Sequence, residues 1–528
     1  MMQAKRWESW TLGVLAGNAL GVLVLLLAAC RYGFEFTDEG SHLIWMADPF
    51  VYSASPTQFG FLLHPLYRLL NGDLAVIRMV NIVTLFLSGW LLCDLALQRS
   101  PFRESPLLAD APRRRLALSA GFAVTVFTLL RAWLPTPNYN SLILQALLLG
   151  VAGLLLLEGR RYPVRVAGWL LVGVGIWLAF FVKPTTAVLL AGAALFHSLT
   201  VRRFDGGLFL LTLLLGLLLS WITVWLIDGS LTAFVGRLTE GHRHYIQMSD
   251  KYTLQAVLKP EMLVWVGLAL LLLWSVGPGV RPLIALLLLS PLMFAFGTGG
   301  SYLLESTKAG IFWVLGASAW LCALVRPARL TRVLLLLGAA AQLLTALLLV
   351  RGLEYPKRQP QALREMEYSL KIGGPGSRLI VPTPFGRYID QAISDAAGAG
   401  FRPGLPVIDM SGRFPGLLYA LQARSSGAPW LVGGTIGRND YAMAVLRTSS
   451  CEELSRAWLL LEYDGPTHLH PKVLASFGAA LADYRQVARW EAPPGTGGHG
   501  ESERQQFMQP IRPGEVSLRA CRAARGEG

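Results

Sequence analysis

The sequence is short of charged residues, and acidic residues are the scarcer kind. Asp, Glu, Lys and Arg make up only 15% of its 528 residues while 53% are hydrophobic, with 33 acidic against 47 basic side chains. Soluble domains carry about 25% charged residues, so this composition excludes an ordinary soluble protein and indicates a membrane protein. The basic surplus clusters in short loops between apolar runs, not on one face with interleaved aromatic residues, so it does not indicate nucleic-acid binding.

Cysteine is also rare. The five cysteines are scattered, and no C-x-x-C pair or cluster of His and Cys indicates a metal site. Three of them, Cys30, Cys93 and Cys322, lie in or beside apolar runs and are expected to be packing residues. Cys451 and Cys521 lie in the polar last third of the chain, where a disulfide is an alternative that spacing alone does not decide. No cofactor is indicated, and a divalent cation stays open.

Apolar runs long enough to cross a bilayer recur from residue 10 to residue 350. The first run follows Lys5 and Arg6 but lacks a small-x-small cleavage site before Cys30, so we expect a retained helix and not a signal peptide. About eleven transmembrane helices are predicted from runs of about 20 residues. They are 10–30, 75–97, 116–134, 140–157, 164–182, 184–198, 207–227, 261–278, 282–297, 309–325 and 330–350.

Arginine in the loops predicts the orientation. With the N-terminus in the cytoplasm, every predicted cytoplasmic loop is basic, as the positive-inside rule requires. An odd number of spans then places the C-terminal region outside. Because the usage of Ala, Leu, Arg and Gly is typical of a GC-rich bacterial genome, we expect a multi-pass protein of the bacterial inner membrane with a periplasmic C-terminal domain. The loop arginines are Arg113, Arg114, Arg115, Arg160, Arg161, Arg165, Arg202, Arg203, Arg281, Arg326, Arg329 and Arg332.

After about residue 350 the composition becomes that of a soluble domain. Residues 351–376, which end in a Gly- and Pro-rich stretch, are predicted to be a linker. The fold class predicted is an all-α polytopic membrane domain (1–350) followed by a small α/β extracytoplasmic domain (377–528). The expected strands are 378–382, 405–410 and 457–462, the expected helices are 388–398 and 474–482, and 492–505 is expected to be a flexible loop.

The polar residues that the positive-inside rule does not explain gather on the predicted outer face. Residues 31–74 form a long first loop, which carries the adjacent carboxylates Asp38 and Glu39 just after the first span. Ordinary solvated loop charges are the alternative reading of this pair. The apolar residues of the loop fall on helical stripes, which predict short amphipathic helices on the membrane surface. The stripes are His42, Trp45 and Met46, and Phe59, Leu62, Leu63 and Leu66.

Three motifs follow each other along the chain on this face. The pair Asp38-Glu39 comes first, then the stretch 61–67 (FLLHPLY) with the turn 71–73 and Arg78, and then 181–186 (FVKPTT). In this order they resemble the GT-C superfamily of integral-membrane glycosyltransferases, including lipid A aminoarabinose transferases, protein O-mannosyltransferases and enzymes that modify the lipopolysaccharide core. The resemblance covers about residues 1–350 and implies a polyprenyl-phosphate-linked sugar as donor.

The implied reaction needs a carboxylate and at least one cation. The acceptor hydroxyl requires a base, for which Asp38 is the first candidate and Glu39 the second, or an orienting partner. The departing phosphate requires positive charge. The residues expected to bind the substrate are His64, Arg78, Lys183, Tyr302 and Lys308.

The cations have structural alternatives. Arg78 lies inside the second predicted span, where it could instead snorkel to the lipid headgroups. Lys183 stands at a helix break and could be an interfacial anchor. Lys308 could form an ion pair with Glu305, three residues earlier.

Histidines give weaker signals. Several relatives have Lys in place of His64, and that Lys contacts the carrier phosphate, so another residue of this chain is the alternative for that role. Pro65 is expected to hold His64 in an extended conformation. Residues 242–244 (HRH) are expected to be a solvated basic loop, because alternate histidines on a loop lack the spacing of a helical metal site.

These observations predict an inverting glycosyltransferase that moves sugar from a polyprenyl-phosphate carrier to an envelope glycan, lipid or protein acceptor on the periplasmic face. Its expected partners are the lipid-linked donor, that acceptor and membrane lipids, with no nucleic acid. The alternatives are a polytopic transporter or lipid flippase, and a membrane scaffold without activity. Transporters usually contain two related halves with polar residues near the membrane midplane, and neither pattern is visible in this sequence.

Overall fold

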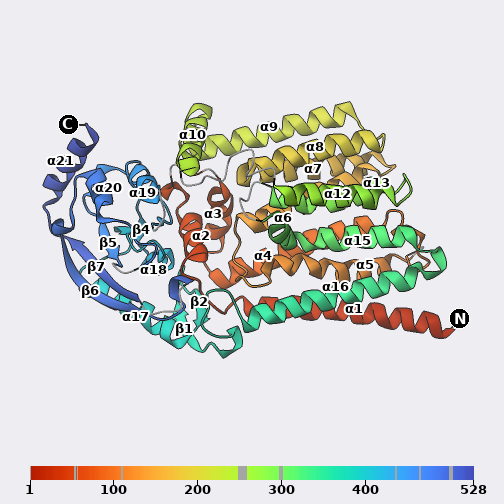
Figure 1. Ribbon diagram of the computed structural model, residues 1–528, viewed down its shortest axis with the longest axis horizontal. Helices are drawn as coiled ribbons and strands as arrows, with labels where there is room; N and C mark the ends of the chain where they lie inside the picture. Colours follow the sequence, from red (N-terminus) through yellow and green to blue (C-terminus); the bar gives the residue numbers. More distant parts are fainter. Residues whose placement is uncertain are drawn as a thin grey trace. The chain divides into compact units, whose positions relative to one another are not determined.

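The computed structural model describes most of the chain, and its elements fall into two compact units (Figure 1). Unit 1 contains Met1–Ala29, Arg78–Leu226 and Lys251–Gly352, and unit 2 contains Cys30–Ile77, Ile227–Asp250 and Leu353–Gly528. The first long loop is therefore grouped with the end of the chain. The described residues are 2–52, 55, 57–108, 111–247, 259–296, 301–433, 437–462, 465–498 and 503–527.

Unit 1 is helical because its sequence consists of long, leucine-rich runs. In the described part of the chain, seven helical segments are long and apolar enough to cross a membrane, and three shorter apolar helices accompany them. The seven are Trp7–Ala29 in α1 (Met2–Ala29), α4 (Leu74–Leu97), α6 (Tyr139–Leu157), α7 (Tyr162–Val182), α9 (Gly206–Asp228), Tyr302–Leu324 and α16 (Pro327–Glu354). The shorter three are α8 (Pro184–Thr200), α12 (Pro260–Trp274) and α13 (Arg281–Ala295).

One predicted span has an irregular backbone. The segment 116–134 was expected to be one helix, but α5 (Pro112–Ala123) continues as the 3-10 helix η3 (Val124–Leu130). The hydroxyls of Thr125 and Thr128 donate to the carbonyl oxygens three residues earlier, which competes with regular α-helical pairing. The predicted span 309–325 corresponds to α15 (Gly310–Leu324), which follows α14 (Tyr302–Ser306) and the 3-10 helix η5 (Thr307–Ala309).

Small residues let helices of unit 1 approach closely. A side chain at Gly153 would come within 2.6 Å of the Gly168 carbonyl oxygen, and one at Gly175 within 2.7 Å of the Ala146 carbonyl oxygen. The backbones of α6 and α7 are therefore in contact, as is common for helices in lipid. Figure 1 shows α6, α7 and α8 running alongside each other.

Unit 2 contains two small sheets. The larger has the order β4-β3-β5-β7-β6, in which β3 is parallel to both β4 and β5 while β7 is antiparallel to β5 and β6. In register, Val407 lies opposite Trp458 and Leu460 opposite Phe507. The strands are β1 (Tyr368–Lys371), β2 (Arg378–Val381), β3 (Pro406–Asp409), β4 (Arg424–Ser425), β5 (Trp458–Leu461), β6 (Tyr484–Ala492) and β7 (Glu503–Pro510).

Helices accompany these strands, and the first loop adds its own. The helices within the C-terminal segment are α17 (Thr383–Gly398), α18 (Pro415–Ala420), α19 (Arg438–Leu446), α20 (Cys451–Leu454) and α21 (Gly514–Arg525). The first loop contributes α2 (Asp38–Ala47) and α3 (Phe59–Leu69), and α10 (Leu231–Gln247) completes the unit. The predicted helical fold class with a small C-terminal α/β region is confirmed.

The predicted strands 378–382, 405–410 and 457–462 are confirmed as β2, β3 and β5, and the predicted helix 388–398 is the end of α17. The predicted α-helix 474–482 is wrong. A 3-10 helix, η7 (Pro471–Phe477), occupies this region and ends at Gly478, whose positive φ of 68° stops the helix.

Other errors concern segments without a regular pattern. The predicted linker contains β1, and β7 begins inside the segment expected to be a loop, of which residues 499–502 lie outside the described part. Residues 242–244 belong to α10 and not to a loop. The side chains of His242 and His244 are outside the described residues, whereas Arg243 is exposed and pairs with Glu240 at 3.3 Å.

A buried polar cluster lies where the parallel strands β3 and β5 end. Asp409 ends β3 and accepts hydrogen bonds from the backbone N–H groups of Ser411 (3.0 Å) and Phe414 (3.0 Å). Arg413, only 1% exposed, pairs with Glu462 at 2.5 Å and with Glu503 at 2.6 Å. Two carboxylates thus share one buried guanidinium. Burial raises the pKa of Glu462 to about 7, although the neighbouring Arg413 acts in the opposite direction.

The disulfide that the sequence left open is present, between Cys451 and Cys521. We predict that the denatured, unreduced protein exposes three reactive thiols out of five and exposes all five after reduction. The bridge joins residues 70 positions apart, so loop-closure entropy predicts a stabilisation of about 4 kcal/mol. The double variant Cys451→Ser/Cys521→Ser should therefore unfold at a lower temperature. Five reactive thiols without reductant would contradict the pairing.

The raised pKa of Glu462 predicts a pH-dependent stability. Since the folded-state pKa of Glu462 lies above its ordinary value of 4.5, the folded protein binds more protons than the unfolded chain between these two values. The stabilisation is complete below about pH 4.5 and is lost as the pH rises through about 7, by about 3 kcal/mol at most. Thermal unfolding of Glu462→Gln should depend less on pH across this window than the wild type. The control is Glu515→Gln on exposed α21, which should follow the wild type.

Candidate functional site

The chain that leads to Asp38 is paired with the C-terminal part of unit 2. Tyr32 forms a parallel bridge with Ile380 of β2. The Gly33 N–H donates to the Ile380 carbonyl oxygen at 2.8 Å, and the Ile380 N–H donates to the Arg31 carbonyl oxygen at 2.7 Å. The first residues of the loop therefore extend the β1–β2 sheet, which fixes the direction in which the chain approaches α2.

Two phenylalanines then anchor this segment. Phe34 and Phe36 are 0% and 2% exposed, and their rings lie 5.3 Å apart in an edge-to-face arrangement. The Phe36 ring also contacts the rings of Phe385 in α17 at 5.4 Å and of Phe414, just before α18, at 6.0 Å. Burying two such rings contributes about 1.5–3 kcal/mol each, so this segment belongs to the core of unit 2.

Glycines bring α2 against α18. The Gly416 N–H donates to the Phe36 carbonyl oxygen at 2.7 Å. A side chain at Gly40 would come within 2.3 Å of the Gly416 backbone nitrogen, so any larger residue would force the two backbones apart. The start of α2, with Asp38, is thereby held directly on the C-terminal segment.

The start of α2 is stabilised by a reciprocal pair of glutamates. The Glu35 carboxylate accepts from the Glu39 N–H at 2.8 Å, and the Glu39 carboxylate accepts from the Glu35 N–H at 2.9 Å. Glu35 also accepts from the Thr37 N–H at 2.9 Å and from the Thr37 hydroxyl. Each carboxylate thus satisfies backbone donors at the end of a helix, in the manner of a capping box.

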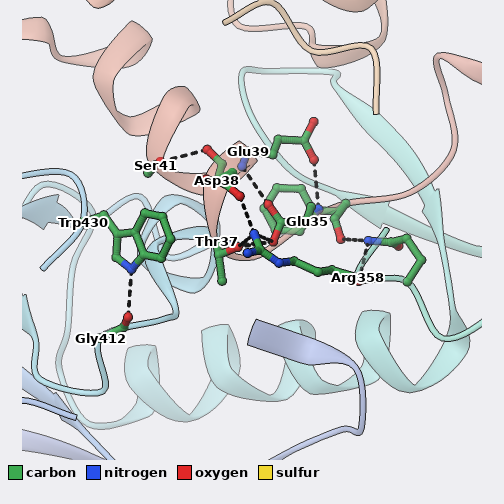
Figure 2. A network of polar contacts seen from close by, with 10 residues as sticks. Glu35, Thr37, Asp38, Glu39, Ser41, Arg358, Gly412 and Trp430 are labelled. Carbon is green, nitrogen blue, oxygen red and sulfur yellow. Dashed lines mark hydrogen bonds and ion pairs between the residues drawn. The ribbon is translucent and has the colours of Figure 1, made fainter. Parts of the chain in front are cut away.

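Asp38 is engaged differently. Its carboxylate forms an ion pair with the Arg358 guanidinium and stays 35% exposed, whereas the Glu35 side chain is only 3% exposed. The Arg358 Nη1 atom also contacts the Thr37 hydroxyl and lies 3.3 Å from Glu35 Oε1. Figure 2 shows the guanidinium at the point where Glu35, Thr37 and Asp38 converge.

The electrostatics of this cluster are set by burial. Desolvation raises the pKa of Glu35, Asp38 acts in the same direction, and the positive charge of Arg358 opposes both. Burial lowers the pKa of His42, one helical turn after Asp38, although the charges of Asp38 and Glu39 act in the opposite direction. The His42 ring packs edge-to-face on Phe59 at 5.2 Å.

His64 joins the two short helices of the loop. Its Nδ1 lies 2.7 Å from the Met46 carbonyl oxygen at the end of α2. The expectation of an extended backbone at His64 is wrong, since Pro65 lies inside α3. Both predicted helices, α2 and α3, are present, and Tyr67 of α3 is hydrogen-bonded to Tyr419 at 2.8 Å between hydroxyl oxygens.

The remaining candidates belong to unit 1. Arg78 is 0% exposed and donates from Nε to the Thr136 hydroxyl at 2.9 Å. The alternative in which Arg78 snorkels to the headgroups is therefore wrong. Asn81, one turn later, donates to the Pro135 carbonyl oxygen at 2.9 Å, so the beginning of α4 is tied to the turn that precedes α6.

Lys183 lies at the break between α7 and α8, where its ammonium donates to the Phe294 carbonyl oxygen at 2.9 Å. Lys308 forms the expected ion pair with Glu305 at 2.7 Å, and both charges act on Lys183. Tyr302 is 2% exposed, with its ring beside Lys259 Nζ at 5.5 Å. Within unit 1, Lys183 and Lys308 are thus close enough for their charges to interact.

Sequence reasoning missed two residues of the cluster around Asp38. The signal for Glu35 was its spacing of four from Glu39, which suits a reciprocal cap. Arg358 gave no signal, because 320 residues separate it from Asp38 and it lies in the predicted linker. Among the described residues, no group of three or more His, Cys, Asp or Glu side chains is placed to hold a metal ion.

The reciprocal cap predicts a structural role for the Glu39 carboxylate. Glu39→Ala should lower the free energy of unfolding by about 1 kcal/mol, because the Glu35 N–H loses its acceptor. Glu39→Gln keeps an amide oxygen at that place and should lose less. Thermal unfolding of the two variants in detergent checks this, and equal stability of Glu39→Ala and wild type would contradict it.

The architecture is similar to that of solved membrane proteins. The crystal structure of ArnT from Cupriavidus metallidurans bound to undecaprenyl phosphate matches with a TM-score of 0.52 at 14% identity, over 92% of this chain and 97% of that chain. The apo state of ArnT gives a TM-score of 0.44 at 13% identity, over 96% and 99%.

The arabinofuranosyltransferase AftD from Mycobacteria, solved by cryo-electron microscopy, gives a TM-score of 0.45 at 16% identity, over 96% of this chain and 41% of that chain. No protein-family model matches the sequence, and no curated protein matches it. The likeness to ligand-bound ArnT extends over nearly all of both chains. The chain therefore shares the fold of ArnT.

Proposed function

We propose that this protein is an integral-membrane glycosyltransferase that takes a sugar from a polyprenyl-phosphate carrier. One observation carries the proposal: a partly exposed carboxylate, Asp38, stands at the start of a helix that is fixed in a core, in a chain with the fold of ArnT. The solved relative is bound to undecaprenyl phosphate. A lipid-linked sugar phosphate is accordingly the donor class proposed for this chain.

In the proposed reaction, the acceptor hydroxyl attacks the anomeric carbon of the donor sugar. The new carbon–oxygen bond forms as the bond to the phosphate oxygen breaks, and the electron pair of that bond leaves with the lipid phosphate. Asp38 takes the proton of the attacking hydroxyl. Because the attack comes from the face opposite the leaving group in a single displacement, the configuration at the anomeric carbon inverts.

The engagement of Glu39 supports Asp38 as the base. The Glu39 carboxylate is 5% exposed and accepts from a backbone N–H, so it is committed to the helix start. Asp38 has no such backbone partner among the described hydrogen bonds and contacts a cation instead. Glu39 is therefore proposed to orient Asp38 and not to act as the base.

Positive charge for the departing phosphate is proposed to come from the cations that the sequence indicated. Lys183 and Lys308 are the first candidates, because their charges act on each other beside the break between two helices. Arg78 is fully buried against Thr136, and Tyr302 beside Lys259, so these two act on the phosphate only by way of rearrangement. His64, engaged with Met46, is a proposed wall residue of the donor site.

The proposed setting is the bacterial inner membrane, with the N-terminus in the cytoplasm and the reaction on the periplasmic face. The disulfide in unit 2 supports this side, because an oxidising compartment maintains such a bond. The proposed acceptor is an envelope glycan, lipid or protein. An assay with and without EDTA tests dependence on a divalent cation.

The proposal predicts that Asp38→Asn lowers transfer by roughly 10²–10⁴-fold, the usual contribution of a general base. Purified protein in detergent would be incubated with labelled polyprenyl-phosphate sugars and envelope extracts, and glycosylated product counted. Asp48→Asn is the matched control in the same loop: Asp48 accepts from the Phe50 N–H at 3.2 Å, and Asn preserves that cap.

Full turnover by folded Asp38→Asn would refute the base assignment. The same labelled donors separate the other function classes. Exchange of intact donor across proteoliposomes, without transfer or hydrolysis, would indicate a transporter or flippase. The absence of transfer, hydrolysis and exchange would indicate a scaffold.

A further inference from the structure

We infer that Arg358 is a positioning residue for the proposed transfer reaction: its guanidinium holds the Asp38 carboxylate in place and keeps it ready to accept a proton. The inference deepens the proposed function and rests on it. Arg358 comes from the segment that follows the last apolar helix, α16, and reaches a carboxylate 320 positions earlier in the chain. The C-terminal segment thereby contributes to the reaction centre itself.

The contacts of Arg358 are convergent. A single nitrogen, Nη1, meets Asp38 Oδ2, the Thr37 hydroxyl and Glu35 Oε1. Glu35 is buried and itself bonded to backbone N–H groups, so it is a fixed point against which the guanidinium is placed. Figure 2 shows the Arg358 side chain extended toward these three residues. Asp38, which is part-exposed, is the member of the set whose orientation depends most on this contact.

The backbone around Arg358 is adapted to this placement. Its φ is 58°, in the left-handed region that few residues other than glycine adopt, and such a conformation persists only where the surroundings impose it. The neighbouring Gln359 donates to the Phe34 carbonyl oxygen at 2.8 Å, which fixes the turn on the first loop. A side chain at Gly498 would come within 3.0 Å of Arg358 Nε, so this glycine leaves room for the guanidinium.

Charge explains what the contact does. Glu35, Asp38 and Glu39 place three carboxylates within five residues, and His42 follows one turn later. Ionised carboxylates this close repel each other, and burial and the charge of Asp38 both raise the pKa of Glu35. Arg358 forms ion pairs with two members of this group, Glu35 and Asp38. Its positive charge opposes their repulsion, and its ion pair with Asp38 holds that carboxylate in place.

The test is steady-state kinetics of Arg358→Gln in purified full-length protein, over a range of pH. We expect kcat to fall roughly 100-fold while KM for the lipid-linked donor changes less than about threefold, as for a group that acts only in the chemical step. We also expect the acid limb of kcat/KM to move to higher pH by about one unit, because a lost cation favours protonated carboxyl groups. A purely structural arginine would not move this limb.

Two further variants keep the test decisive if Arg358→Gln does not fold. Arg358→Lys retains a cation but loses the planar guanidinium, so kcat should fall by about tenfold with the acid limb unchanged. Thr37→Val removes one contact of Nη1 but leaves both charges. Its kcat should therefore fall by less than that of Arg358→Lys, again with the acid limb unchanged. Arg522→Gln removes an exposed pair with Glu452 in the same unit, and its kinetics should equal those of the wild type.

The outcomes are distinguishable. Wild-type kcat and an unmoved acid limb in folded Arg358→Gln or Arg358→Lys, with inactive Asp38→Asn, would overturn this inference and leave the proposed function standing. A raised donor KM with unchanged kcat and pH profile would also overturn it, because Arg358 would then contact the donor. A wild type that transfers no sugar from any polyprenyl phosphate would overturn both.

Discussion

The structure of unit 2 depends on the burial of Phe36 and the backbone contact beside it. The Phe36 ring lies among Phe34, Phe385 and Phe414, and its carbonyl oxygen accepts from Gly416. These contacts use both the apolar and the polar parts of one residue, so the loop cannot shift without losing both. Because Asp38 follows two residues later, the position of the proposed base is determined by a hydrophobic core and not by a free loop.

This arrangement reconciles two requirements that conflict in a membrane protein. A base must be charged and reachable, while backbone and carboxylate groups near lipid must be satisfied within the protein. Glu35 and Glu39 meet the second requirement, since each accepts from the backbone of the other. Asp38, between them in sequence, is the proposed base, and Arg358 supplies the opposite charge. Three carboxylates of one stretch thus have separate tasks that follow from their contacts.

The sequence was informative where periodicity or composition carries the structure. The long apolar helices, the helices α2 and α3, and the strands β2, β3 and β5 follow from such patterns. The sequence was uninformative where a residue distant along the chain determines the local structure or the ion pair. β1 lies in the polar segment that was predicted to be a linker and is a strand because β2 pairs with it. Arg358 lies in the segment predicted to be a linker, and only the structure shows that it pairs with Asp38. His64 was misjudged because the restriction that proline imposes on its predecessor was weighed above the α-helix that surrounds it.

The pairing of Arg358 with Asp38 also bears on what the C-terminal segment is for. An appended domain that only bound an acceptor would need no contact with the first loop. Here the segment pairs with the loop backbone through Ile380, surrounds its aromatic residues and neutralises its carboxylates. Each of these contacts would be lost if the chain ended after α16, and the charges of Glu35 and Asp38 would then repel each other without compensation. The C-terminal segment is therefore better understood as the second half of the proposed reaction centre, which the first loop alone cannot form.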